Sequence, residues 1–193
     1  MHVGVDSFVA AVTDPSTERL VGPEERMAHL LEEIALADEV GLYSFGIGEH
    51  HRPEYYDSAP PVILAAAAAR TSRIRLGSAV AVLSAADPVR VFQQFATLDL
   101  ISKGRIDLVV GRGSFTEAFP LFGLSLADYD ELFAEKLGLL LTLDAGNPVT
   151  WSGRFRPPLQ QAQILPRPTA KAGLGEHLRI AVANRRGSPP MIA

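Results

Sequence analysis

Short apolar runs alternate with amphipathic segments along the chain. Residues 1–8 alternate loosely between apolar and polar side chains and are rich in strand-forming residues, which predicts a first strand. The segment "PEERMAHLLEEIALADEV" carries its apolar residues at helical spacing and predicts a helix that begins at Pro23 and ends before Gly41. The apolar run "LYSFGIG" is bounded by turn residues and predicts a second strand.

The same pattern repeats toward the C-terminus. We expect helices at "PPVILAAAAARTS", "DPVRVFQQFATLDLIS" and "LADYDELFAEKLGLLLTL", and strands at "IRLGSAVAVLS", "RIDLVVGRG" and "HLRIAVA". Asp87 and Pro88 suit the N-cap and first position of a helix that Lys103 and Gly104 end. A segment rich in Pro, Gly and Arg follows the last helix. We expect its residues 151–158 to pack on the surface. The alternative is that these residues cover the functional site.

This alternation predicts an α/β fold made of right-handed βαβ units around a parallel sheet. An open doubly wound sheet and a (β/α)8 TIM barrel both satisfy the pattern. The first strand is followed by "DSFVAAVTDP", which lacks the glycine fingerprint of a dinucleotide-binding fold. Polar residues gather instead after the expected strands, where a barrel has its active site. They are Asp6, Ser7, residues 49–52, Ser84, Arg112 and Ser114.

We therefore expect residues 1–193 to form a single TIM-barrel-like domain. A full barrel has eight strands and about 250 residues. The sequence supplies about five to six βα units, so the barrel is expected to be incomplete.

Composition narrows the classes of partner. Apolar residues make up 47% of the chain and charged residues 21%, values typical of a globular domain. The net charge of −4 without a basic run argues against nucleic acid and acidic membrane surfaces. There is no cysteine, so disulfides and thiolate metal sites are excluded, and we expect no metal. No signal peptide or membrane-spanning run is recognisable, and a cytoplasmic location is expected.

The stretch "GEHHRPEYY" contains the strongest candidates for catalysis. Imidazole side chains titrate near neutral pH, so Glu49 and His50 could serve acid–base chemistry. Adjacent residues of a strand point to opposite faces, so His50 and His51 are poorly placed to share a metal ion. The alternative is that these side chains only bond loop backbone.

Two further stretches could bind a ligand. Gly111 and Gly113 flank Arg112, which would let a guanidinium and open backbone approach a flat or anionic ligand. A tight turn with a solvated arginine explains them equally well. The small residues of "LGSAVAVL" would admit a ring system or simply pack in a narrow barrel.

The stretches "GLYSFGIGEHH", "RIRLGSAVAVLSAADPVRVFQQFATLDLISKGRIDLVVGRG" and "FPLFG" together resemble the bacterial luciferase-like flavin-dependent monooxygenases. The resemblance runs from Met1 to about Pro168. It implies a barrel enzyme that uses reduced FMN and oxygen on a small organic substrate, with a separate flavin reductase as a candidate partner. The alternatives are a deazaflavin-dependent oxidoreductase on the same fold and a non-catalytic flavin-binding or dimerising remnant.

The resemblance also assigns residues. It implies that His50 lies close to the reactive part of the flavin and that Glu49 orients it. The implied cofactor-binding residues are Ala79, Val80, Gly111, Arg112, Gly113 and Phe115, with the cis peptide bond that the family often carries falling between Ala79 and Val80. Phe8, Phe45 and Phe115 would keep water out of the barrel mouth.

The end of the chain departs from the family pattern. The tail "NRRGSPPMIA" resembles the end of the next family helix and the start of a sixth strand, without the loop that carries much of the flavin phosphate site. Arg185 and Arg186 are expected to be solvated, with an anion contact as the alternative. An incomplete barrel leaves strand edges unpaired, and family members commonly dimerise, so we expect a homodimer.

Overall fold

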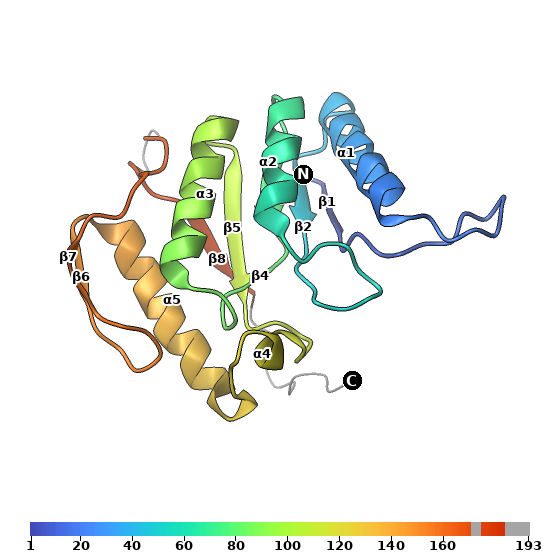
Figure 1. The fold of residues 1–193 in the computed structure, drawn as a ribbon. Helices are drawn as coiled ribbons and strands as arrows, with labels where there is room; N and C mark the ends of the chain where they lie inside the picture. The colour runs from blue at the N-terminus through green and yellow to red at the C-terminus, as the bar shows by residue number, and fades with distance from the viewer. Residues whose placement is uncertain (171–174, 184–193) are drawn as a thin grey trace.

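The computed structural model describes residues 1–170 and 175–183, which form a six-stranded parallel sheet and a separate two-stranded hairpin. The strands β1, β2, β3, β5 and β8 lie side by side in that order, and the short β4 continues along β5 where β3 ends (Figure 1). Their bounds are Gly4–Ser7 for β1, Ser44–Ile47 for β2, Arg75–Ser78 for β3, Ala81–Val82 for β4, Ile106–Gly111 for β5 and Arg179–Val182 for β8. The predicted parallel α/β fold is confirmed.

The long helices cover one face of this sheet (Figure 1). They are α1 (Pro23–Glu39), α2 (Pro60–Arg70), α3 (Pro88–Ser102) and α5 (Tyr129–Ala145). Each contacts the next, α1 with α2, α2 with α3 and α3 with α5, so they form a single layer. A doubly wound sheet would carry helices on both faces, so this arrangement is that of part of a barrel.

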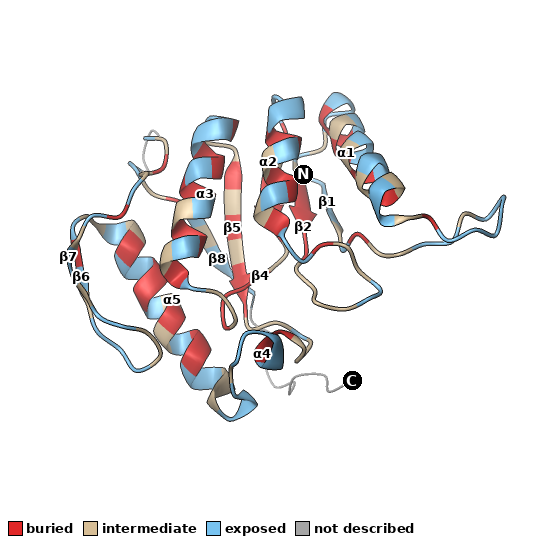
Figure 2. Ribbon diagram, in the orientation of Figure 1, coloured by how far each residue is buried: buried red, intermediate tan, exposed pale blue. Residues whose placement is uncertain are grey.

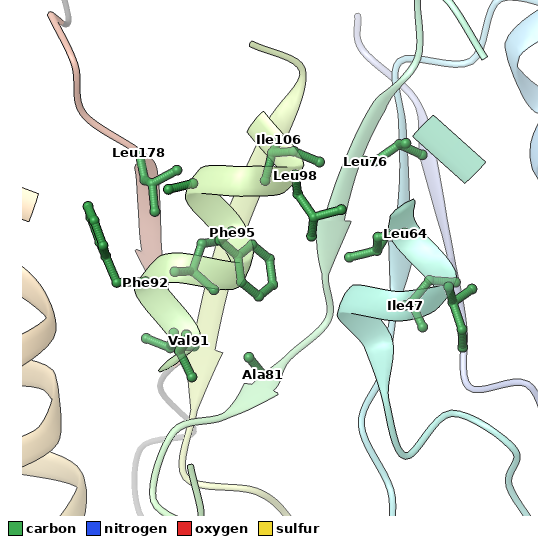
Figure 3. Close-up of a cluster of buried hydrophobic side chains, with 14 of the residues drawn as sticks. Ile47, Leu64, Leu76, Ala81, Val91, Phe92, Phe95, Leu98, Ile106 and Leu178 are labelled. Atoms are coloured by element: carbon green, nitrogen blue, oxygen red, sulfur yellow. The ribbon is translucent and has the colours of Figure 1, made fainter. Parts of the chain in front are cut away.

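The core lies between that helical layer and the sheet. Figure 2 shows the buried residues along the sides of the helices that face the strands. Leu76 of β3 and Ile106 of β5 meet Leu64 of α2 and Phe95 of α3, and all four are buried (Figure 3). Alternate strand residues point to the opposite side of the sheet. We call that side the inner face.

The helix ends follow the sequence signals. The Asp87 carboxylate accepts hydrogen bonds from the backbone N–H groups of Val89 and Arg90, as expected for the N-cap of α3. Lys103 and Gly104 have φ angles of 58° and 88°, which end that helix in the left-handed region. Gly41, with φ of 81°, does the same after α1.

Some elements differ from the sequence predictions. The expected single strand over 74–84 divides into β3 and β4 around a cis peptide bond between Ala79 and Val80. The predicted helix that begins at Leu126 divides into a one-turn 3₁₀ helix, η1 (Leu126–Asp128), and α5, and the sequence pattern did not reveal the short helix α4 (Ala118–Leu121) or the hairpin of β6 (Val149–Trp151) and β7 (Leu159–Ala162). These elements are too short to show a clear hydrophobic period.

The hairpin lies against α5, on the helical side of the sheet. The Glu135 carboxylate of α5 accepts hydrogen bonds from the backbone N–H groups of Arg154 and Phe155. Residues 151–158 therefore pack on the surface, as expected, and do not cover the inner face. The tail at residues 184–193, where the sequence departs from the family pattern, lies outside the described residues. The predictions for Arg185 and Arg186 fall within this tail.

Candidate active site

The candidate site lies where the parallel strands end at their carboxyl termini. The chain leaves β1 at Phe8, β2 at Gly48 and β5 at Arg112, and all three exits are at the same edge of the sheet. The loop that follows β2 turns back at residues 49–57 before α2 begins. This loop contains His50.

His50 is paired with a buried carboxylate that the sequence analysis did not single out. Its ring Nδ1 lies 2.8 Å from Oδ2 of Asp57, and its backbone N–H donates to Oδ1 of the same residue over 3.1 Å. Asp57 is fully buried, and the His50 side chain is 13% exposed. Both oxygens of Asp57 are therefore engaged by His50.

Three aromatic rings surround the imidazole. The ring centroids of Tyr55, Phe8 and Phe115 lie 4.4, 4.8 and 5.6 Å from that of His50. Phe8 follows β1, Tyr55 shares the His50 loop, and Phe115 follows β5. The rings of three separate chain segments thus fix the plane of the imidazole and exclude water from its sides.

Backbone contacts hold Phe8 in this position. Val9, which is buried, has a φ of 47°, an uncommon value for a β-branched residue. Its carbonyl accepts a hydrogen bond from the Tyr56 backbone N–H over 3.0 Å, which ties the loop after β1 to the loop after β2. Such backbone conformations persist where the surroundings fix them, often at functional sites.

Glu49 does not contact His50, although we expected it to orient that residue. Its Oε2 accepts a hydrogen bond from the Val82 backbone N–H over 2.9 Å, and its Oε1 lies 3.3 Å from Nε2 of His51. Successive residues in an extended segment point in opposite directions, so Glu49 and His51 share one side and His50 takes the other. Glu49 therefore positions β4, and Asp57 positions His50.

The structure brings together three of the predicted cofactor residues. The expected cis peptide bond between Ala79 and Val80 is present. A Cβ atom added to Gly111 would lie 2.7 Å from Cγ2 of Val80, and one added to Gly46 would lie 2.9 Å from Cβ of Ala79. Strands β2, β3 and β5 can therefore meet at this level only because Gly46 and Gly111 have no side chain.

Gly113 and Phe115 lie nearby, whereas the Arg112 side chain is directed toward α5. Gly113 has a φ of 83°, which favours glycine, and its added Cβ would lie 2.9 Å from Cγ1 of Val82. The Arg112 guanidinium lies 4.5 Å from the ring centroid of Phe133, and its Nε is 3.1 Å from Oδ1 of Asp130.

Phe133 and Asp130 both belong to α5, so the Arg112 side chain lies against that helix, and its contact with the cofactor stays a prediction. Phe45 is placed differently from the expectation. It is buried in the main core and does not line the mouth.

A salt bridge joins the loops after β2 and β5. Arg52 Nη1 donates to Oε1 of Glu117 over 2.6 Å, and its guanidinium lies 4.8 Å from the ring centroid of Phe115. Hydrogen bonds to Glu54, together with the charges of Glu54 and Glu117, raise the pKa of Arg52. This contact keeps Phe115 beside His50.

Small residues and one proton-transfer group meet at the strand ends. On the inner face, the Asp6 carboxylate and the Ala79 methyl group fill the space beside Gly46, and the Val80 side chain fills the space beside Gly111. His50 adds a single group that can hold or move a proton beside that surface. A hollow of about 490 Å³ lined by His2, Tyr43 and Arg73 lies at the opposite end of the strands and does not belong to this site.

Metal sites and membrane-spanning helices were also sought in the part of the chain that the structure describes. Among those residues, no cluster of three or more His, Cys, Asp or Glu side chains is arranged to hold a metal ion. Within the same residues, no helix has the length and apolar character needed to cross a membrane.

Comparison with known proteins identifies the family. The profile of the family described as "Luciferase-like monooxygenase" matches residues 1–192. The 4-hydroxyprotoasukamycin monooxygenase of Streptomyces nodosus subsp. asukaensis is 36% identical over 122 residues, which are 62% of this chain and 33% of that protein. The F420-dependent glucose-6-phosphate dehydrogenase of Amycolatopsis mediterranei (strain U-32) is 32% identical over 147 residues, which are 72% of this chain and 44% of that protein.

Solved structures show the same fold. The monooxygenase RslO1 from Streptomyces bottropensis superposes with a TM-score of 0.81 at 30% identity, over 94% of this chain and 53% of that chain. The oxygenating constituent of 3,6-diketocamphane monooxygenase of Pseudomonas putida, solved in complex with FMN, gives a TM-score of 0.74 at 21% identity. The chain thus spans less than half the length of these two curated relatives, and about half of the RslO1 chain.

Proposed function

Because the chain belongs to the luciferase-like monooxygenase family, we propose that it is an oxidoreductase that uses reduced FMN and oxygen on a small organic substrate. The observation that carries the proposal is the position of His50. It stands at the carboxyl end of β2, enclosed by Phe8, Tyr55 and Phe115, and its ring is paired with the buried Asp57 carboxylate.

Each group has a distinct part in this proposal. The bound flavin would supply the redox chemistry. Ala79, Val80 and Gly111 would contact the face of its ring, and His50 would hold or move one proton at its edge through Nε2. Phe8 and Phe115 would exclude water, which would otherwise compete in the reaction.

Binding and turnover test the proposal separately. We expect the chain to bind reduced FMN in an anaerobic titration followed by flavin absorbance. We expect oxygen-dependent turnover to fall at least about 100-fold in His50→Gln, since a positioned general acid or base contributes roughly 100- to 10,000-fold. His29→Gln, on an exposed position of α1, is the matched control and should behave like the wild type.

Equal turnover in His50→Gln and the wild type would remove His50 from the chemistry. Failure to bind any flavin would favour the alternative that the chain is a non-catalytic remnant.

A deazaflavin-dependent oxidoreductase is the second candidate. The Amycolatopsis relative, whose name specifies F420, matches over 72% of this chain. Such an enzyme would transfer a hydride and would not consume oxygen. The same anaerobic titration with reduced F420 separates the two candidates, because tight F420 binding without FMN binding would replace the first proposal by the second.

A further inference from the structure

We propose that Asp57 is a positioning residue that keeps the proton of neutral His50 on Nδ1 and leaves Nε2 free to accept a proton in the site. The pairing itself is a property of the chain. Its consequence for catalysis rests on the function proposed above.

Hydrogen-bond chemistry determines which ring nitrogen carries the proton. A carboxylate only accepts hydrogen bonds, whereas a neutral imidazole has one donor nitrogen and one acceptor nitrogen. Oδ1 of Asp57 accepts from the backbone N–H of His50 over 3.1 Å, and Oδ2 lies 2.8 Å from Nδ1 of its ring. The proton in the second contact must therefore be on Nδ1.

The surroundings prevent the pair from rearranging. Asp57 is fully buried, so water does not compete for its oxygens. An added Cβ at Gly48 would lie 2.9 Å from Oδ2 of Asp57 and 3.0 Å from Cε1 of His50, which shows how closely the chain that leaves β2 packs against the pair. The ring is further enclosed by Tyr55 and Phe115.

Nε2 of His50 remains as the reactive atom. Within residues 1–170 and 175–183 it makes no hydrogen bond, and it belongs to a side chain that is 13% exposed. A proton leaving a bound ligand can be accepted by Nε2, which converts His50 to an imidazolium, and can return from Nε2 to the product. The Asp57 carboxylate stabilises the imidazolium while it exists.

Asp57→Asn tests the inference because it preserves the shape of the side chain and replaces one acceptor oxygen by an NH₂ group, which donates hydrogen bonds. The backbone N–H of His50 is always a donor, so the oxygen of the new amide must face it. The amide NH₂ then faces Nδ1 and donates to it, and the ring proton moves to Nε2. In the variant, Nε2 of His50 therefore carries a proton and cannot accept another, whereas in the wild type it is free to accept one.

The readout is a long-range ¹H–¹⁵N NMR spectrum of the flavin-free chain in mildly alkaline buffer. His50→Gln identifies the His50 signals among the five histidines. We expect protonated Nδ1 in the wild type and protonated Nε2 in Asp57→Asn. We also expect flavin-dependent turnover to fall at least about 100-fold in the variant, with flavin affinity little changed. Asp14→Asn, in the exposed loop before α1, is the matched control.

Several results would overturn the inference. A wild-type spectrum with the proton on Nε2 would do so without any variant, even if Asp57→Asn did not fold. A folded Asp57→Asn chain with the wild-type tautomer, or with the turnover of an active wild type, would do the same. If the wild type binds neither reduced FMN nor reduced F420, the proposed function fails, and the two spectra still decide whether Asp57 sets the tautomer.

Discussion

At the scale of single residues, Gly48 provides the space in which His50 and Asp57 meet. A Cβ atom added at this position would lie 2.6 Å from Cδ1 of Phe8, 2.9 Å from Oδ2 of Asp57 and 3.0 Å from Cε1 of His50. The aromatic ring and the carboxylate are both held by other contacts, so neither can yield without disturbing the pair. Gly48 thus links the packing of β2 directly to the geometry of the site.

We therefore expect Gly48→Ala to lower the free energy of unfolding by about 1–3 kcal/mol, the usual cost of overpacking. It should also shift the ¹⁵N signals of His50. Gly138→Ala is the matched control, because Gly138 is exposed in α5 with no atom within 4 Å of an added Cβ. That control should raise stability by about 0.5–1 kcal/mol through helix propensity. Urea denaturation compares the two, and equal stabilities would contradict the packing argument.

At the scale of elements, a buried carboxylate joins α1 to the start of β3. Asp38 accepts hydrogen bonds from the backbone N–H groups of Ser72, Arg73 and Ile74 over 2.9, 2.9 and 2.6 Å. Burial by itself raises the pKa of Asp38, but these backbone hydrogen bonds outweigh it, and the pKa is lowered from its ordinary value. The lowered pKa means that folding favours the ionised carboxylate.

Asp38→Asn should therefore change both the stability and its dependence on pH. The amide donates where a carboxylate accepts, which leaves a buried N–H without its partner and costs about 1–3 kcal/mol at neutral pH. In the wild type, the contribution of Asp38 is complete above the unfolded-state pKa near 3.8 and is lost as the pH falls through the lower folded-state value. The difference between the two proteins should consequently shrink in acid.

Urea denaturation at pH values above and below 3.8 measures this difference. Glu39→Gln, at the adjacent exposed position of α1, is the control and should match the wild type at neutral pH. A stability difference for Asp38→Asn that stays constant down to strongly acidic pH would contradict the role assigned to its charge.

The sequence predicted an element correctly where a long run of periodic apolar residues was bounded by residues typical of helix ends. The helices that begin at Pro23, Pro60 and Pro88 were located by apolar spacing and by their first residues. The division at Ala79 and Val80 left no mark in the hydrophobic pattern, because the residues from Leu76 to Leu83 form one continuous run of small and apolar side chains. Its position was expected only from the family resemblance.

The site was predictable to the extent that it depends on strand order and alternation. His50 was located because it follows β2 at the carboxyl edge. Arg112 shares its direction with Leu108 and Val110 of the preceding strand, and both of these residues are apolar. A strict period of two would have assigned it to the helical side. Asp57 was missed because the fold of a loop, which brings it back to His50, has no such period.

At the scale of the whole molecule, the described sheet has two free edges. β1 pairs only with β2, and β8 pairs only with β5. Val5 on β1 and Val182 on β8 are 41% and 43% exposed, next to backbone groups that lack a neighbouring strand among the described residues. Exposed apolar edges favour pairing with a further chain.

We accordingly expect this chain to form a homodimer or a larger assembly at micromolar concentration. Lysine on an edge strand opposes edge pairing, because it would place a charge within the new interface. The double variant Val5→Lys with Val182→Lys should therefore shift the mass measured by light scattering toward the monomer. Leu36→Lys with Val62→Lys places the same charges on exposed positions of α1 and α2, and should leave the mass unchanged. If only the Leu36→Lys with Val62→Lys variant dissociates, the interface lies on the helical layer. A monomeric wild type would contradict self-association by either surface.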